Sequence, residues 1–348
     1  MTKKALIVSP YLDHLGGGER YMLSVSQVLE SLGYDIYFAW DNLVEINQLS
    51  QMLGIVLKNT HLDPKVKDLY FSGSAIAMYL ATKPYDVCVY LSDGSIPLLG
   101  GRRNIIHMQV PFHGVAGGSV QNKIKLQFIY SVIVNSQFTK KVIDSEYRLN
   151  SVVLYPPVAP IKGSSQKEKI ILSVGRFEPS LNAKKQDILI EAMRLLTKDL
   201  PDWKLVLAGG SSSDDWLNTL RQKATGLPVI FYPNATHDEL SDLYSRSQIY
   251  WHAAGYKIDE VKNPELTEHF GISTVEAVSA GCIPLVVPYG GQREIVKSEV
   301  LHWQAIQELV TKTKAVIADP NRSKYLDDIS VSLYTVDNFA RNFGMIIV

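Results

Sequence analysis

The sequence has few cysteines and no excess of charge of either sign, and these absences exclude whole classes of protein. Its 348 residues include two cysteines, Cys88 and Cys282, both inside apolar runs. Two cysteines cannot build a disulfide framework or a cysteine-based zinc site, so we expect buried, reduced thiols in a cytoplasmic protein. Lysine plus arginine number 35 and aspartate plus glutamate also number 35, a balance that argues against bulk attraction to nucleic acid.

Long apolar runs are also missing. No stretch approaches the roughly 18 apolar residues that a membrane span requires. The short apolar run at the start ends at Pro10, which predicts a first strand rather than a secretory signal. The chain contains no Asp-x-Asp motif, so a paired-carboxylate site for Mg²⁺ or Mn²⁺ is not indicated and we expect no metal site.

Short apolar, β-branched runs alternate with longer helical patterns along the whole chain. In the helical stretch 184–198, for example, apolar residues recur at three- and four-residue spacing. Apolar runs without clean alternation are typical of buried parallel strands, so the pattern predicts an α/β fold with right-handed crossovers. The predicted strands are 5–9, 35–39, 86–91, 104–107, 132–135, 152–155, 169–174, 204–208, 229–232, 248–252 and 282–287.

A stiff, proline-rich segment divides the chain. Residues 155–160 read Tyr-Pro-Pro-Val-Ala-Pro, which cannot be a central strand, and a polar stretch and a new apolar run follow. We predict two doubly wound domains, 1–157 and 158–330, and a C-terminal segment, 331–348, that packs back on the first domain. Ligands of such sheets bind beyond the carboxyl ends of the strands, so a cleft between two facing sheets is the expected site.

Three consecutive glycines, Gly16, Gly17 and Gly18, follow the first predicted strand and open a helix. Glycine lets backbone amides approach a ligand closely, and a helix N-terminus favours an anion. A dinucleotide-binding fingerprint would need a third glycine where Tyr21 stands, so hydride transfer is not favoured. The alternative to a ligand site is a tight turn without a ligand.

Cationic side chains follow the predicted strand 169–174. Arg176 comes directly after it, and Lys184 and Lys185 open the next helix. An arginine and a lysine that converge at the carboxyl end of a strand can neutralise a diphosphate without a metal. The alternative is that these lysines are simply solvated, although cations at a helix start oppose the helix dipole.

Two glutamates, Glu268 and Glu276, flank the most informative motif in the chain. The residues between them start a helix, so free backbone amides there can hold phosphate oxygens. These amides belong to Phe270, Gly271 and Ile272. Glu276 can accept two hydrogen bonds from a ribose diol. Ser273-x-x-Glu276 also fits a capping box, in which Glu276 only caps its own helix.

The sequence EHFGISTVEAVSAGCIPLVVPYGGQREIV, which begins at Glu268, resembles the Glu-x7-Glu signature of the family 4 retaining glycosyltransferases. Other segments resemble the same family in the same order: GGGER at 16–20, SVGRF and KKQDILIEA within 173–192, and WKLVLAGG at 203–210. The resemblance covers nearly the whole chain. It implies the GT-B fold, in which two Rossmann-like doubly wound domains face each other across an interdomain cleft. The first domain would bind the acceptor and the second a nucleotide-sugar donor.

Residue by residue, the resemblance implies that Arg176 and Lys184 contact the donor diphosphate and stabilise the leaving group. Lys184 has the family's spacing to the helix that follows, but its distance from Arg176 is longer than usual, which keeps Lys185 open as the alternative. Glu268 would lie beside the donor sugar, and Glu276 would hold the nucleotide ribose. Backbone amides near the phosphates, the acceptor or the nucleotide would come from Gly17, Gly18 and Gly209.

His107 resembles the family's active-site histidine near the donor sugar and the acceptor. It ends the predicted strand 104–107, and a histidine at the carboxyl end of a strand faces the predicted cleft. His113 is the competing candidate, and either histidine can be an ordinary loop residue.

Two further segments bear on substrate and location. Residues 255–267 form a polar insert ahead of Glu268, which we interpret as a loop that contacts acceptor or donor sugar, or else as a solvated excursion. Residues 119–141 carry four lysines beside apolar side chains, after Arg102 and Arg103. Such a face suits a lipid-linked acceptor at an anionic membrane, and its alternative is a solvated helix.

These features predict a metal-independent retaining glycosyltransferase without a cofactor. It would move a hexose-type sugar from a UDP- or GDP-linked donor to a glycan or a lipid-linked saccharide. We expect it in the cytoplasm, in peripheral contact with the inner membrane face. Two alternatives use the same donor site: a GT-B nucleotide-sugar epimerase and a non-catalytic nucleotide-sugar-binding protein.

Overall fold

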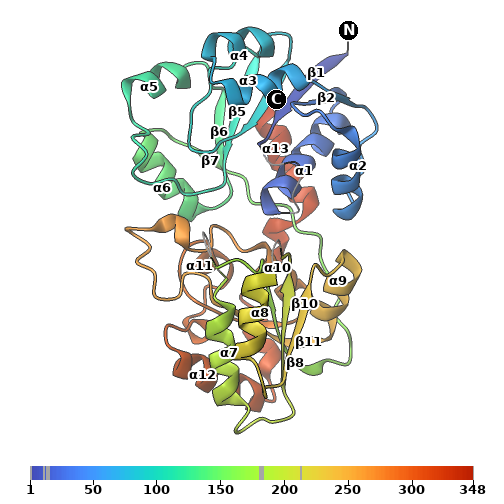
Figure 1. Ribbon diagram of the computed structural model, residues 1–348, viewed down its shortest axis with the longest axis vertical. Coiled ribbons are helices and arrows are strands. Elements are labelled where there is room, and N and C mark those ends of the chain that lie inside the picture. The colour runs from blue at the N-terminus through green and yellow to red at the C-terminus, as the bar shows by residue number, and fades with distance from the viewer. Residues whose placement is uncertain (1, 11, 13–15, 180–183, 212–213, 348) are drawn as a thin grey trace. The chain divides into compact units, whose positions relative to one another are not determined.

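The computed structural model describes residues 2–10, 12, 16–179, 184–211 and 214–347, which form two compact units (Figure 1). Unit 1 comprises residues 1–157 and 336–348, and unit 2 comprises residues 158–335. The break after residue 157 falls inside the proline-rich segment 155–160, where the sequence predicted it. Unit 2 extends to Thr335, beyond the end predicted at residue 330.

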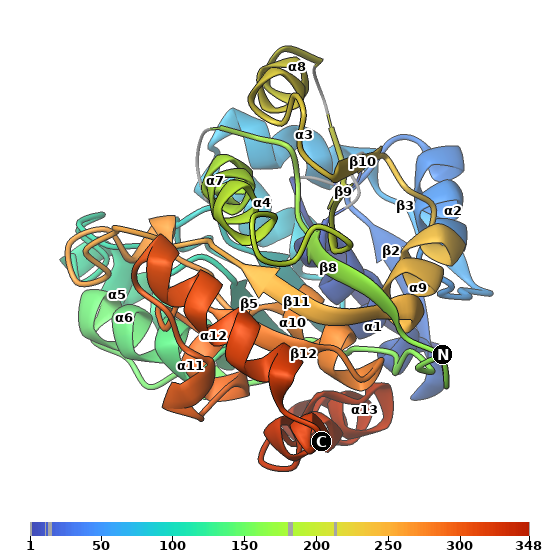
Figure 2. The same cartoon turned by 90° about the horizontal axis from the view of Figure 1, so that it is seen from below.

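The described residues of unit 1 form a sheet of seven parallel strands in the order β3-β2-β1-β4-β5-β6-β7 (Figures 1 and 2). The strands are β1 (Lys3–Val8), β2 (Tyr34–Phe38), β3 (Thr60–Leu62), β4 (Val87–Leu91), β5 (Arg103–Met108), β6 (Ser131–Val134) and β7 (Val152–Val153). The strands predicted for this half are confirmed. The edge strand β3 was not predicted, because its three residues do not form an apolar run.

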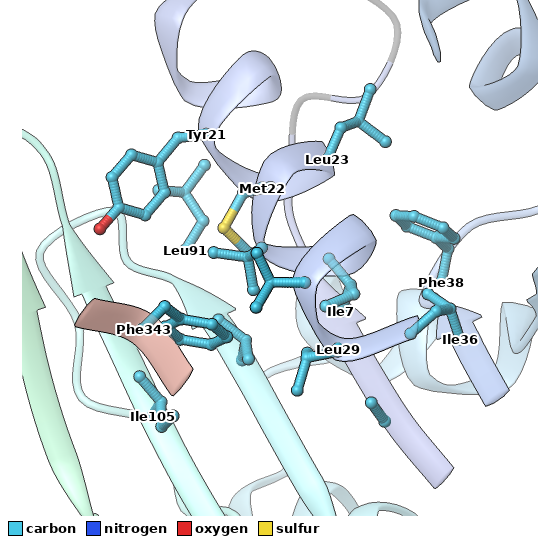
Figure 3. Packing of buried hydrophobic residues seen from close by; sticks show 14 of the residues in the cluster. Ile7, Tyr21, Met22, Leu23, Leu29, Ile36, Phe38, Leu91, Ile105 and Phe343 are labelled. Carbon is cyan, nitrogen blue, oxygen red and sulfur yellow. The ribbon is translucent and has the colours of Figure 1, made fainter. Parts of the chain in front are cut away.

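Alternate residues of a strand in unit 1 enter different cores, because successive side chains point to opposite faces of a sheet. Ala5 and Ile7 join one core together with helices α1 (Gly17–Ser31), α2 (Leu43–Met52) and α13 (Val336–Ile347). Figure 3 shows Phe343 of α13 packed between α1 and the strands. The last helix of the chain is therefore part of the core of unit 1.

The opposite face of the same sheet is covered by other helices. Leu6 and Val8 pack with residues of α3 (Pro64–Ser72) and α4 (Ala75–Thr82). A third cluster joins β5 and β6 to α6 (Gln137–Tyr147), with Leu126 of α5 (Val120–Leu126) against it. Both faces of the sheet are thus buried, as a doubly wound fold requires.

The described residues of unit 2 form a sheet of five parallel strands in the order β10-β9-β8-β11-β12. The strands are β8 (Glu168–Val174), β9 (Lys204–Gly209), β10 (Val229–Pro233), β11 (Ser247–His252) and β12 (Ile283–Val286), and all five were predicted. Helices α9 (His237–Arg246) and α10 (Ile272–Ser279) share a core with one face. Helices α7 (Gln186–Leu196), α8 (Asp214–Lys223) and α12 (Ile306–Ala318) pack together on the other (Figure 2), where Trp251 donates a hydrogen bond to Thr313.

The carboxyl ends of the unit 2 strands meet at one edge, since all the strands are parallel. Backbone hydrogen bonds continue past the strand ends, from Gly175 N to the Ala208 carbonyl (2.9 Å) and from Asn234 N to the Gly209 carbonyl (2.8 Å). The loops that follow β8, β9 and β10 are therefore fixed side by side. This edge is where the predicted donor-site residues of unit 2 gather.

Candidate active site

The centre of the site in unit 2 is the buried carboxylate of Glu268, in the loop between β11 and α10. Its Oε2 lies 2.6 Å from Nζ of Lys184 and 2.7 Å from Nε2 of His252. The three side chains are nearly enclosed, with exposed fractions of 11% for Glu268, 17% for Lys184 and 3% for His252. One carboxylate oxygen thus accepts from two nitrogen donors, Lys184 in the loop after β8 and His252 at the end of β11.

The electrostatics of this cluster keep Glu268 ionised. Burial alone would raise the pKa of its carboxyl, but the charge of Lys184 and the hydrogen bond from His252 outweigh burial and hold that pKa well below its usual range. A buried anion is tolerated only when it is paired in this way. The carboxylate is therefore a fixed negative charge at the strand edge.

Local backbone geometry brings Lys184 to this position. A β-carbon at Gly175 would collide with the Lys184 side chain, so the absence of a side chain at 175 lets the lysine cross the end of β8. Gln186, the first residue of α7, donates through Nε2 to the Arg176 carbonyl (2.9 Å) and fixes the same turn. Lys185 adopts a left-handed conformation (φ +54°) as the N-cap of α7. Of the two candidate lysines, Lys184 is the one that reaches Glu268.

Arg176 lies on the rim of this cluster. It is exposed, and it has no ion-pair partner within the described ranges of the chain. Gly209 is the last residue of β9 and has a conformation suited to glycine (φ +145°), with its Cα directly against the Gly175 backbone. The backbone at the ends of β8 and β9 is therefore packed more closely than any larger residue would permit.

Helix α10 begins at Ile272 and is preceded by Gly271 in a left-handed conformation (φ +116°). The capping-box interpretation of Ser273 and Glu276 is wrong, because Gly271 is the N-cap and no side chain caps the helix. Glu276 instead accepts a hydrogen bond from the Tyr244 hydroxyl (3.0 Å). Glu268 lies before the helix, so the two glutamates are not on one continuous helical face. The Phe270 and Ile272 amides flank Gly271 at this helix start.

The turn at Gly290 and Gly291 closes the site from the β12 side. The Gly291 N–H donates to the Glu268 carbonyl at 2.7 Å. A β-carbon at Gly290 would overlap that same carbonyl, and one at Gly291 would collide with the backbone of His269 and Phe270. The turn thus lies directly on the backbone that carries Glu268.

In unit 1, His107 lies at the end of β5 and is fully buried. Its ring stacks on Tyr21, with centroids 3.8 Å apart and planes 2° apart, and its Nδ1 lies 3.3 Å from the Ile133 carbonyl. Burial lowers the pKa of His107 to about 3, so the ring is neutral at physiological pH. No hydrogen-bond partner for Nε2 occurs among the described residues. The competing candidate, His113, is exposed.

Gly17 and Gly18 open α1, and Gly16 is its N-cap. A β-carbon at Gly18 would meet the Gln109 side chain, which follows β5 two residues after His107. The glycine loop and the end of β5 therefore lie against each other within unit 1. The structure groups these residues in unit 1 and the cluster of Lys184 and Glu268 in unit 2.

His252 is the principal site residue that the sequence interpretation missed. His252 is the last residue of β11 and His107 the last but one of β5, so a position at the carboxyl end of a parallel strand is the signal that could have identified His252. Its Nδ1 is buried and has no hydrogen-bond partner in the part of the chain that the structure describes. Over that same part, no group of three or more His, Cys, Asp or Glu side chains could hold a metal ion, and no helix is long and apolar enough to cross a membrane.

Each unit contains one parallel sheet with helices on both faces, and two such units fit two Rossmann-like domains. A solved glycosyltransferase from Rickettsia africae ESF-5 aligns with 99% of this chain and 98% of its own, at a TM-score of 0.68 and 16% identity. The fold class is GT-B, as further solved structures with TM-scores of 0.72 and 0.67 also indicate.

Residues 158–330, nearly all of unit 2, match the family model of the Glycosyl transferases group 1. The putative glycosyltransferase YtcC of Bacillus subtilis (strain 168) is 30% identical over 180 residues, 46% of this chain and 40% of that protein. A human protein named GDP-Man:Man(3)GlcNAc(2)-PP-Dol alpha-1,2-mannosyltransferase is 33% identical over 184 residues, 47% of this chain and 35% of its own. The chain spans less than half the length of these two curated relatives.

Proposed function

We propose that the protein is a family 4 retaining glycosyltransferase, which transfers a hexose-type sugar from a nucleotide-diphosphate sugar without a metal. The observation that carries the proposal is the cluster of Lys184, Glu268 and His252 at the strand edge of a unit that matches group 1 glycosyltransferases. The human relative's name contains GDP-Man, which supports a nucleotide-linked sugar as the donor. Both UDP- and GDP-linked donors fit the proposal.

Arg176 and Lys184 are the proposed partners of the donor diphosphate. Arg176 is exposed on the rim, where its guanidinium can bind two phosphate oxygens at once. Lys184 uses one N–H on Glu268 and retains two more donors. As the bond from the anomeric carbon to the phosphate breaks, these cations stabilise the charge that develops on the leaving diphosphate.

Glu268 and Glu276 are the proposed partners of the two sugars of the donor. Glu268 Oε2 accepts from two donors, whereas Oε1 has no hydrogen-bond partner among the described residues and is available to a hydroxyl of the transferred sugar. Glu276 would accept from the ribose hydroxyls. The amides of Phe270, Gly271 and Ile272, together with that of Gly209 at the end of β9, would line the phosphates.

Retention follows from attack on the same face that the leaving group departs. In the proposed step the acceptor hydroxyl oxygen bonds to the anomeric carbon, the bond to the phosphate oxygen breaks, and the hydroxyl proton passes to that phosphate oxygen. Glu268 is a poor candidate for a covalent nucleophile, because Lys184 and His252 both hold its charge. Fixed cations and helix amides take the role that a metal has elsewhere.

Unit 1 is the proposed acceptor domain. His107 is neutral and buried, so its proposed contribution is a hydrogen bond from a neutral ring and not a proton carried at neutral pH. Gly17 and Gly18 would offer backbone amides at the start of α1. The acceptor is proposed to be a glycan or a lipid-linked saccharide.

A basic and apolar surface of unit 1 supports a lipid-linked acceptor. Four large apolar side chains on and after α5 are exposed: Val120 (72%), Ile124 (55%), Phe128 (44%) and Tyr130 (54%). Lys123 lies among them, and the Arg103 guanidinium sits 5.2 Å from the centre of the Tyr130 ring. An anionic membrane attracts such a surface through both charge and apolar area, and we propose peripheral contact with the cytoplasmic membrane face.

The donor proposal is tested by thermal denaturation with UDP, GDP, ADP and their sugars, each with EDTA present. A nucleotide diphosphate at 100 times its dissociation constant should stabilise the protein by about 2.7 kcal/mol. Lys184→Ala should abolish sugar transfer, and Lys185→Ala is the matched control. Absence of a response to every nucleotide would overturn the proposal. Conversion of the donor sugar without acceptor would indicate an epimerase, and binding without turnover a non-catalytic protein.

A further inference from the structure

The insert 255–267 is attached to the site at several points. Tyr256 is 7% exposed and its ring centre lies 5.3 Å from that of Trp303. Pro264 is buried, and the Thr267 hydroxyl donates to its carbonyl at 2.8 Å. The middle of the insert is the part most open to solvent: Val261 is 78% exposed, and Lys257, Asp259 and Lys262 are exposed as well. The predicted alternative of a solvated excursion therefore describes this middle part and not the whole insert.

Glu260 connects the insert to the Gly290–Gly291 turn. Its Oε2 accepts a hydrogen bond from the Gly290 N–H at 3.0 Å, and its Oε1 forms an ion pair with Arg293. The Glu260 side chain is 19% exposed and that of Arg293 50%, so the carboxylate is largely buried while the guanidinium faces solvent in part. A single carboxylate thus holds the turn at its backbone and at a side chain three residues further on.

The Gly290–Gly291 turn also fixes the backbone of Glu268. The Gly291 N–H donates to the Glu268 carbonyl at 2.7 Å, and no room exists for a β-carbon between Gly290 and that carbonyl. A turn that lies in contact with a backbone cannot shift without moving it, because packed protein interiors contain little free space. The position of Glu260 is therefore transmitted to the Glu268 backbone over two contacts.

We propose that Glu260 is a positioning residue for the sugar-transfer site, which sets the Glu268 carboxylate through the Gly290–Gly291 turn. The inference rests on the proposed function, since Glu268 is there the partner of the transferred sugar. Misplacement of a group at the reacting centre slows chemistry far more than it weakens the remote nucleotide contacts. Loss of Glu260 should consequently lower kcat and leave the affinity for a free nucleoside diphosphate nearly unchanged.

The experiment compares variants that remove different parts of the contact. Arg293→Ala removes the ion pair and keeps the bond to Gly290, whereas Glu260→Ala removes both. We expect kcat to fall about tenfold or more in Glu260→Ala and by less in Arg293→Ala, with the Kd for the nucleoside diphosphate within about twofold of the original. Glu260→Gln, which retains an acceptor for the Gly290 N–H, should recover part of kcat.

Lys262→Gln is the matched control, because Lys262 belongs to the same insert but its side chain is 80% exposed and, among the described residues, forms an ion pair with Asp259 alone. It should leave kcat unchanged. An unchanged kcat in Glu260→Ala would overturn the proposal. So would a loss of kcat accompanied by an equal loss of nucleotide affinity and a large fall in Tm, because that result would indicate general unfolding of the loop.

A second readout separates this proposal from the donor assignment. Hydrogen exchange of the Gly290 and Gly291 amides should accelerate at least tenfold in Glu260→Ala and remain unchanged in Lys262→Gln. Unchanged exchange in Glu260→Ala would overturn the positioning role whatever the substrate. If the original protein binds no nucleotide but its amides respond as expected, the proposed function fails while the mechanical link between Glu260 and the turn stands.

Discussion

Lys184 and Glu268 lie 84 residues apart in the sequence, and their side chains meet at 2.6 Å. The contact exists because β8 and β11 are neighbours in the sheet although β9 and β10 separate them in the chain. Lys184 comes from the loop after β8 and Glu268 from the loop after β11. The parallel topology thus assembles the cation and the anion of the site at one edge.

Loss of the Lys184 charge should damage both activity and stability. In Lys184→Met, Glu268 would remain buried, with His252 as its one remaining side-chain partner in the described part of the chain, and removal of one member of a buried pair costs about 3–5 kcal/mol. The lower end of that range is expected, since His252 still donates. Measured by denaturant unfolding, Lys184→Met should be less stable than the original protein by that amount and inactive in sugar transfer.

Lys185→Met is the control for this change, because the two lysines are adjacent and equally charged. Lys185 has no ion pair within the residues that the structure describes, so its loss should change the free energy of unfolding by less than about 0.5 kcal/mol. Equal destabilisation by the two substitutions would contradict the role given to the buried pair.

His107 should make unfolding depend on pH over a particular range. Its ordinary pKa of 6.5 applies to the unfolded chain, whereas burial lowers the pKa of the folded state to about 3. Below pH 6.5 the unfolded chain therefore binds a proton that the folded protein does not. The stability contributed by the neutral ring is complete above pH 6.5 and is lost at about 1.4 kcal/mol per pH unit as the pH falls toward 3.

His107→Phe removes this titration and retains a ring that can stack on Tyr21. The free energy of unfolding of this variant should fall less steeply between pH 6.5 and 4.5 than that of the original protein. Glu268 does not alter the slope between pH 6.5 and 4.5. The pKa of its carboxyl in the folded state lies below the ordinary 4.5, so the stability that its charge contributes is lost only below about pH 4.5. Parallel pH profiles for the two proteins would refute the burial argument.

The strands could be predicted from sequence because a buried parallel strand is a run of apolar residues. Strand β3 was not predicted, because it lies at a sheet edge with one neighbouring strand and needs no apolar run. Its residues are Thr60, His61 and Leu62. Spacing favoured Lys184 over Lys185, but the choice between them could not be settled from the sequence. It depends on the left-handed backbone at Lys185, which no side-chain pattern encodes.

Long-range contacts were the least predictable part of the site. His252 occupies the same kind of position as His107, but its partner Glu268 could be recognised only after β11 and the following loop were folded together. The link from Glu260 to Arg293 spans 33 residues and depends on the path of the insert. Residue types and strand ends thus predict which side chains reach the edge, while the pairs among them follow from packing.

A methyl group at Gly290 should disturb the site more than the same change elsewhere. Gly290 has φ +64°, and a β-carbon there would overlap the Glu268 carbonyl. Gly290→Ala should cost about 2–4 kcal/mol, from backbone strain together with forced movement of a packed neighbour. Sugar transfer should fall at the same time, since the Glu268 backbone would have to shift.

Gly226→Ala is the control for that substitution, because Gly226 has φ +76° but nothing lies within 4 Å of the added carbon. It carries the backbone strain alone and should cost about 1 kcal/mol, with transfer activity unchanged. Equal effects of the two alanines on activity would show that the turn does not constrain Glu268.

The surface around α5 should bind anionic membranes. The double variant Val120→Ser with Ile124→Ser removes two side chains that are 72% and 55% exposed, so folding should be little affected. In sedimentation with vesicles containing phosphatidylglycerol, the double variant should bind more weakly than the original protein. Lys123→Glu should also weaken binding, by about thirtyfold, since each cation near an anionic surface contributes about 1 kcal/mol and a charge reversal counts twice. Val56→Ser is the matched control, because Val56 is 66% exposed but lies in the loop before β3. Equal binding to neutral phosphatidylcholine vesicles, or no binding at low salt, would refute the electrostatic contact and with it the membrane-bound acceptor.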